Sequence, residues 1–164
     1  MTSFQEAMKE YRKQMENGII REAYKGLMDY IMELRLHFKN NYPDYFVSGS
    51  IYVGYMDMTY FSFFPESLKR RKLKMGIVFI HETCRFEVWL FGYNKQIQTK
   101  YWTLIKESGW DAYRLPSTTK GVDSILEYTL ADNPDFSDVD RLTKQIEKGT
   151  LKFMKAVGDF LSKS

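Results

Sequence analysis

The feature that most constrains this chain is a change in the spacing of its apolar residues, from a helical period to a period of two. Before Pro43 the apolar residues recur three and four positions apart, which predicts helices. Between Ile51 and Phe91 they alternate with other residues, and β-branched and aromatic side chains predominate, which predicts strands. Such a chain packs helices against a mainly antiparallel sheet and belongs to the α+β class.

Two helices are expected before the change of period. Ser3 and Glu6 have the spacing of a capping box, and Asn17-Gly18 ends the helix that follows. A second, longer helix carries an apolar stripe from Ile20 to Leu34, and it ends before Pro43 because a residue preceding proline avoids helical dihedrals.

Four strands are expected next, at 50–55, 58–64, 73–80 and 84–91, with a tight connection over 81–84. If the last two strands pair so that partner numbers sum to 165, apolar pairs fall on one face of the sheet. That face would carry Phe79 with Phe86, Ile77 with Val88 and Met75 with Leu90. The other face would carry Val78 with Glu87, Gly76 with Trp89 and Lys74 with Phe91, which is a mixture of aromatic and charged chemistry.

The C-terminal part predicts a third helix, a further strand and a fourth helix. Asn94 can cap the third helix, which ends at Gly109, and Ser137 with Asp140 predicts the cap of the last one. Residues 122–131 fit either a strand or a short helix, and the strand is favoured because Tyr128 and Thr129 are β-formers. We therefore expect a single α+β domain over 1–164, with about five strands and four helices.

Charge and cysteine content limit the class of protein. Lys and Arg number 24 against 21 Asp and Glu, and a net charge of +3 excludes a strongly basic nucleic-acid coat protein. The single Cys84 is typical of a reducing compartment. The chain shows no secretory signal and no apolar run of about 20 residues, so we expect a cytoplasmic protein without a membrane partner.

Three stretches carry a resemblance to a known family. Residues 42–60, 77–89 and 132–136 read YPDYFVSGSIYVGYMDMTY, IVFIHETCRFEVW and DNPDF. Over nearly its full length the chain resembles an uncharacterised bacterial family of small cytoplasmic proteins, a domain of unknown function. The resemblance implies a bacterial cytoplasmic origin and carries over no activity and no site residues.

No complete metal or cofactor motif is present, so we expect no metal site and no cofactor. His81-Glu82 begins like a zinc metalloprotease motif, but Arg85 stands where the second histidine belongs, and His37 is the only other imidazole. Ser48-Gly49-Ser50 lacks the flanking glycines of a nucleophile elbow. Residues 117–121 have hydroxyls and a lysine suited to a phosphate, but a solvated turn is the favoured interpretation.

The sharpest charge feature is a basic run between the second and third expected strands. One interpretation is a salt-dependent contact for a polyanion such as RNA or DNA. The favoured one is a surface connection whose charge keeps the strand edge soluble. The run consists of Lys69, Arg70, Arg71, Lys72 and Lys74.

A divergent metal-dependent nuclease is an alternative from another class. The element order is similar to a restriction-endonuclease-like core, in which Asp57 and Glu87 would hold the metal. The motif is broken because Trp89 occupies the lysine position, so Lys95 or Lys100 would have to assist.

The preferred interpretation is a non-catalytic domain that binds a small molecule or a protein partner with the mixed face of the sheet. Aromatic rings at β spacing also serve as packing, under helices or a second subunit, so a homodimer stays open. Charges between the rings argue against complete burial. The candidate ligand-binding residues are Tyr52, Tyr60, Arg85, Glu87, Trp89 and Tyr93.

Overall fold

The structure is a computed structural model that describes residues 1–164 and contains five helices and five strands. In chain order they are α1 (Phe4–Asn17), α2 (Ile19–Asn41), β1 (Phe46–Val47), β2 (Met58–Phe64), α3 (Glu66–Arg70), β3 (Leu73–Ile80), β4 (Arg85–Gly92), α4 (Lys95–Ser108), β5 (Ser124–Ala131) and α5 (Val139–Ser162). The strands form one antiparallel sheet, and their order in the sheet is their order in the chain. The expected α+β class is confirmed.

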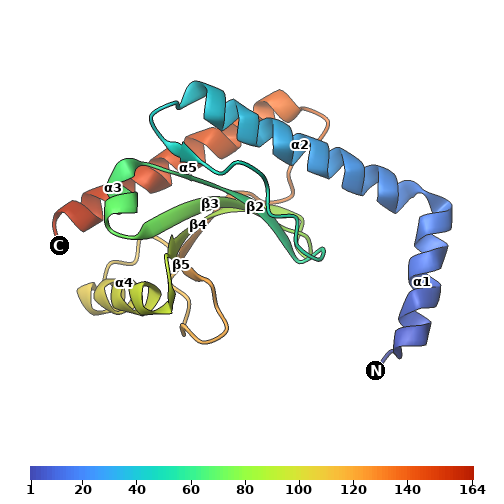
Figure 1. Ribbon diagram of the computed structural model, residues 1–164, viewed down its shortest axis with the longest axis horizontal. Coiled ribbons are helices and arrows are strands. Elements are labelled where there is room, and N and C mark those ends of the chain that lie inside the picture. Colours follow the sequence, from blue (N-terminus) through green and yellow to red (C-terminus); the bar gives the residue numbers. More distant parts are fainter.

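The main core lies between the sheet and two helices. Figure 1 shows α2 and α5 on one side of the sheet and α4 on the other. Phe38 of α2 is fully buried, with its ring 4.6 Å from that of Phe63. On α5, Phe153 is fully buried and packs near Tyr128 of β5. Burying each such ring contributes about 2 to 3 kcal/mol, so these layers hold the sheet in place.

The β3–β4 hairpin has the predicted register. Phe79 pairs with Phe86, Val78 with Glu87 and Gly76 with Trp89, so partner numbers sum to 165. Successive side chains point to opposite faces of a sheet. Met75, Ile77, Phe86, Val88 and Leu90 therefore join the core, whereas Lys74, Val78, Arg85, Glu87 and Trp89 share the other face.

The predicted strand at 50–55 is wrong. The first strand is the two-residue β1, and of the predicted segment only Tyr52 makes a bridge, to Tyr60 of β2. Gly54 and Met56 have positive φ angles of 74° and 62°, which no extended strand accommodates. A fifth helix, α3, was also not expected, and it occupies the connection between β2 and β3.

Two expectations for the C-terminal part have different outcomes. The strand favoured at 122–131 is confirmed as β5. The cap of α5 is Asp138 rather than Ser137, because the Asp138 carboxylate accepts a hydrogen bond from the Arg141 amide at 3.2 Å. The Ser137 hydroxyl is directed instead to Asp135, where it donates a hydrogen bond.

Helix α1 stands away from the sheet, as Figure 1 shows. The predicted capping box is present, with the Ser3 hydroxyl and the Glu6 carboxylate each accepting from the other's amide. No residue of α1 is buried, and the ring of Phe4 is 81% exposed. Gly18, with φ 81°, separates α1 from α2. None of the helices combines the length and apolar character needed to cross a membrane.

Candidate ligand-binding site

The face of the sheet opposite α2 and α5 carries a row of aromatic rings. Ring centroids lie 5.1 Å apart for Tyr52 and Tyr60, 5.9 Å for Tyr60 and Phe91, and 5.8 Å for Trp89 and Phe91. We call these four residues the aromatic face. Trp89 is half-buried and Tyr52 is 46% exposed, so the protein's own helices do not enclose this row. Burial raises the pKa of the Tyr60 phenol, which therefore stays protonated and neutral.

Glu87 lies beside the aromatic face and is almost completely buried, with 2% of its surface exposed. Its Oε1 accepts a hydrogen bond from Trp89 Nε1 at 2.7 Å, and its Oε2 lies 2.8 Å from Arg85 Nε. The buried Arg85 Nε–H is not aligned with an acceptor, so this contact is an ion pair without a hydrogen bond. The Glu87 carboxylate therefore has charged and polar partners within the protein and is not on a solvated surface.

A hollow of about 420 Å³ lies next to Glu87, where residues 111–114 run along β5. Arg114 and Glu127 exchange backbone hydrogen bonds there, and their side chains form an ion pair at 3.5 Å. Ser124 donates a hydrogen bond to the same Glu127 carboxylate at 2.6 Å. Glu87, Arg114 and Glu127 therefore already have partners within the protein, whereas the Asp111 side chain, which also lines the hollow, forms no ion pair and no hydrogen bond.

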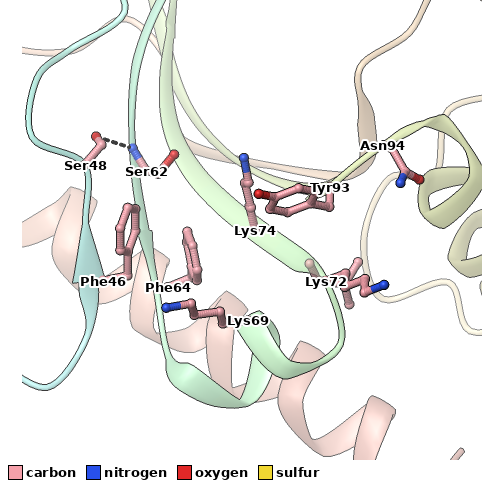
Figure 2. A pocket seen from close by; sticks show the side chains of 10 residues that line it. Phe46, Ser48, Ser62, Phe64, Lys69, Lys72, Lys74, Tyr93 and Asn94 are labelled. Atoms are coloured by element: carbon pink, nitrogen blue, oxygen red, sulfur yellow. Dashed lines mark hydrogen bonds between the residues drawn. The ribbon is translucent and has the colours of Figure 1, made fainter.

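A larger pocket of about 730 Å³ opens at the α3 end of the same face of the sheet (Figure 2). Ser62 of β2 and Lys74 of β3 belong to the face that carries Tyr60 and Trp89. Lys69 of α3 and Lys72, in the turn after α3, line it as well. We call this cavity the lysine pocket. It brings three lysines of the predicted basic run together with Tyr93, which is the one predicted ligand-binding residue that lines it.

The three lysines of the pocket carry unpaired charge. The six ion pairs of the protein involve none of Lys69, Lys72 and Lys74, and no acidic residue lines the cavity. Lys74 Nζ lies 4.7 Å from the centroid of the Tyr93 ring, a cation–π contact. Like charges that line one concave surface reinforce each other's potential, so the cavity attracts anions.

The remaining walls of the lysine pocket are aromatic and polar. Figure 2 shows Phe46 and Phe64 on one side and Tyr93 on the other, with Lys74 between them. The rings of Phe46 and Phe64 lie 4.8 Å apart, which follows from the pairing of β1 with β2. Ser48 Oγ accepts a hydrogen bond from the Ser62 amide at 3.0 Å and fixes the loop after β1.

The sequence did not indicate Phe46, Phe64 or Ser48 as site residues. A first strand at 50–55 leaves Phe46 outside the sheet, and the sequence of residues 48–50 resembles only part of a nucleophile motif. A signal was nevertheless present, because Phe46-Val47 is an aromatic and β-branched pair just before Ser48-Gly49.

The other residues of the basic run do not line the pocket. The Arg71 guanidinium donates a hydrogen bond to the Leu161 carbonyl at 3.0 Å and so holds the C-terminal end of α5. Arg70 is exposed in the last turn of α3. The predicted polyanion contact is thus divided among a pocket, a helix terminus and the open surface.

The carboxylates of the nuclease alternative each have separate partners. Asp57 lies in the loop before β2, where backbone N–H groups, first that of Tyr55 at 2.9 Å, lower the pKa of its carboxyl. Glu87 is engaged by Arg85 and Trp89. No group of three or more His, Cys, Asp or Glu side chains is arranged to hold a metal ion.

The two lysines proposed to assist that chemistry have other contacts. Lys95 donates to the carbonyls of Thr119 and Val122, and Lys100 lies over the ring of Tyr101. The structure therefore gives the nuclease alternative no assembled site.

His81 is partly buried at the end of the β3–β4 hairpin. Its Nε2 lies 2.8 Å from Thr59 Oγ, and its ring stacks on that of Tyr24. Burial lowers the pKa of the imidazole, with Asp57 acting in the opposite direction. His81 therefore helps to fix the end of the hairpin against α2.

Comparison with known proteins identifies the family. The fold and the pocket define an α+β protein with an antiparallel sheet and a basic, aromatic cavity. Residues 4–161 match the model of the family described as Domain of unknown function (DUF7000), so the chain belongs to that family. No curated protein and no solved structure matches it. The expected membership of an uncharacterised family is confirmed.

Proposed function

We propose that the protein is a non-catalytic binding protein that takes an anionic small molecule into the lysine pocket. The observation that carries this proposal is that Lys69, Lys72 and Lys74 line one cavity with aromatic walls and that no acidic residue lines it. A volume of about 730 Å³ is within the range of small-molecule sites. We also propose a bacterial cytoplasmic setting, and the single exposed thiol of Cys84 supports the reducing compartment in this proposal.

The electrostatics of the cavity favour a ligand that brings its own negative charge. Lys74 is half-buried, so a neutral ligand would cover its ammonium group without compensating it. A phosphate or carboxylate would form charge-assisted hydrogen bonds with the lysines as water leaves the pocket. The aromatic walls would then cover the apolar part of the same molecule.

Calorimetry with matched anions and neutral analogues tests the proposal. The panel holds phosphate esters and polycarboxylates together with the uncharged alcohol or amide of each. We expect at least one anion to bind while its analogue does not. The variant K69Q/K72Q/K74Q should lose about tenfold or more in affinity, since each lysine supplies a charge-assisted contact.

The matched control is K9Q/K13Q/K144Q, which removes the same charge from exposed lysines that form no ion pair. This control should bind as the wild type does. Equal losses in the two variants would mean that net charge, and not the pocket, governs binding. A panel without any binding anion would refute the proposed function.

Nucleic-acid binding through the basic run is the second candidate. The exposed Arg70 beside Lys69 favours it, because both lie outside the buried core on the last turn of α3. Affinity for a single-stranded oligonucleotide should then fall steeply as salt is raised. Charge neutralisation of Arg70 should weaken this binding and leave small anions unaffected.

A further inference from the structure

We infer that the ligand of the lysine pocket is a nucleoside phosphate, with its base against Phe46 and its phosphate at the lysines. This inference rests on the proposed function, because it identifies the chemical class of the anion that the same pocket would take. It follows from three parts of the cavity: an aromatic wall, a cationic region and two polar side chains.

The aromatic wall is suited to a flat ring. Phe64 is nearly buried, with 4% of its surface exposed, whereas Phe46 beside it is 47% exposed. The two rings are tilted by 33° at 4.8 Å, so Phe64 supports one side of Phe46 from within the protein. A base placed against the exposed part of Phe46 that lines the cavity would contact this aromatic wall, and stacking on such rings tolerates every base.

The cationic region is suited to a phosphate. Lys69, Lys72 and Lys74 line the cavity from a helix, a turn and a strand, and their ammonium groups point in different directions, so the positive charge is spread along the cavity (Figure 2). Lysine binds phosphate as a point charge and needs no fixed planar geometry. The ring of Tyr93 lies under Lys74 Nζ at 4.7 Å and holds this ammonium group at the cavity.

Two polar side chains also line the cavity: Ser62 on the side of Phe46 and Phe64, and Asn94 at the opposite end, beyond Tyr93 (Figure 2). The Ser62 hydroxyl makes no hydrogen bond within the protein, although its backbone amide is bound by Ser48. The Asn94 carbonyl oxygen caps α4 through the Ile97 amide at 2.9 Å, which leaves the amide nitrogen of its side chain as a free donor. A sugar presents hydroxyl groups that pair with such donors and acceptors.

The dimensions favour one nucleotide over a polymer. The cavity is bounded by α3, by the β1–β2 pair and by the start of α4, and it encloses about 730 Å³. A polymer would need a continuous basic groove with successive stacking rings. Arg71, which would continue the basic surface, is bound instead to the Leu161 carbonyl.

Titration calorimetry with a graded set of probes tests this inference. The set is AMP, UMP, ribose 5-phosphate, adenosine, inorganic phosphate and a single-stranded oligoadenylate. We expect AMP and UMP to bind about tenfold or more tightly than ribose 5-phosphate, because the base adds a stacking contact. Adenosine should bind more weakly than AMP, since it lacks the charge.

Two substitutions assign the parts of the ligand to the parts of the pocket. Phe46→Ala should bring the affinity for AMP down to that for ribose 5-phosphate, and ribose 5-phosphate itself should be unaffected. Lys74→Gln should weaken both compounds. Phe46→Leu, which keeps an apolar residue at the β1–β2 pair, gives the same comparison if the alanine variant is unstable. Phe4→Ala, at an 81% exposed ring on α1, is the control and should change nothing.

The outcomes separate the inference from the proposed function. If ribose 5-phosphate binds as tightly as AMP, the nucleotide inference is wrong and the anion-binding function stands. If the oligoadenylate binds far more tightly than AMP, the single-nucleotide inference is wrong and nucleic-acid binding replaces it. If a polycarboxylate binds and none of these probes does, the ligand is not a phosphate compound. The nucleotide inference is then wrong, and the anion-binding function stands. If no anion of any kind binds, both proposals fall.

Discussion

Three polar side chains join α2 to α5 on the edge of the core. Glu147 of α5 accepts hydrogen bonds from the Tyr42 phenol and from His37 Nε2, the latter at 2.7 Å. Burial is the larger cause and the hydrogen bond to Glu147 the next, and together they raise the pKa of Tyr42 to about 12. Burial alone would raise the pKa of the Glu147 carboxyl, but the hydrogen bonds from Tyr42 and His37 outweigh it and lower that pKa.

This arrangement predicts a loss of stability at high pH. The folded pKa of Tyr42 lies above the ordinary value of 10.0, so its contribution is complete below pH 10 and is lost as the pH rises toward 12. Wild type should exceed Tyr42→Phe in free energy of unfolding at pH 8, and this difference should shrink between pH 10 and 12. Urea denaturation at each pH measures it. A difference that stays constant, or an equal trend in the exposed control Tyr11→Phe, would contradict the prediction.

The Arg85–Glu87 pair predicts coupled effects on stability. Arg85→Ala leaves a buried carboxylate with only the Trp89 bond, and it should cost about 3 kcal/mol of unfolding free energy. The double variant R85A/E87A should cost less than the sum of the two single changes, because it also removes the uncompensated charge. Denaturant titrations of the four proteins give the coupling energy. Additive costs would show that the pair does not interact.

At the scale of elements, β4 and α4 meet at a glycine. A Cβ atom on Gly92 would lie 2.5 Å from the Gln98 amide nitrogen and 2.9 Å from its Cα, both of which are backbone atoms. Gly92→Ala should therefore displace α4 and destabilise the fold by about 1 to 3 kcal/mol. Gly26→Ala, in the open middle of α2, should instead stabilise it by about 0.5 to 1 kcal/mol. Thermal unfolding compares the two, and effects of the same sign would contradict the packing described.

Elements that depend on side-chain alternation could be predicted from the sequence, whereas those that depend on tertiary contacts could not. The β3–β4 register follows from side-chain alternation alone, because a shift of one residue would turn Phe79 and Phe86 away from the core. The error at 50–55 arose from Gly54 and Met56, since their left-handed dihedrals depend on tertiary contacts rather than on composition. Side-chain alternation also predicts that Arg85 and Glu87 share one face of the sheet. It does not predict how deeply the Glu87 side chain is buried.

The lysine pocket, too, could be predicted from the sequence only in part. Lys74 and Tyr93 were each predicted as contact residues, but as parts of two separate sites. Their contact depends on β3 and β4 pairing as far as Leu73 and Gly92, which brings the end of the basic run beside the start of α4. Phe46 enters only through the short β1 strand, which sequence periodicity cannot resolve.

At the scale of the whole molecule, stability is divided between a packed body and an exposed α1. Met75 of β3 is fully buried, whereas Met8 of α1 is 42% exposed. Met75→Ala should cost about 2 to 5 kcal/mol, and the matched Met8→Ala should change the unfolding free energy by less than about 0.5 kcal/mol. Denaturant titration measures both. A large cost at Met8 would show that α1 packs against something in solution.

The agreement between strand order and chain order has a consequence for how the molecule reaches its native state. Three of the four pairings join strands that are separated by at most ten residues, and only β4 and β5 are further apart, with α4 and the rest of residues 93–123 between them. The loop-closure entropy of the first three steps is correspondingly small. Proteins with such local contacts fold faster than sheets assembled from remote strands. A stopped-flow experiment should show refolding at the speed of mixed α/β proteins rather than of β-sandwiches.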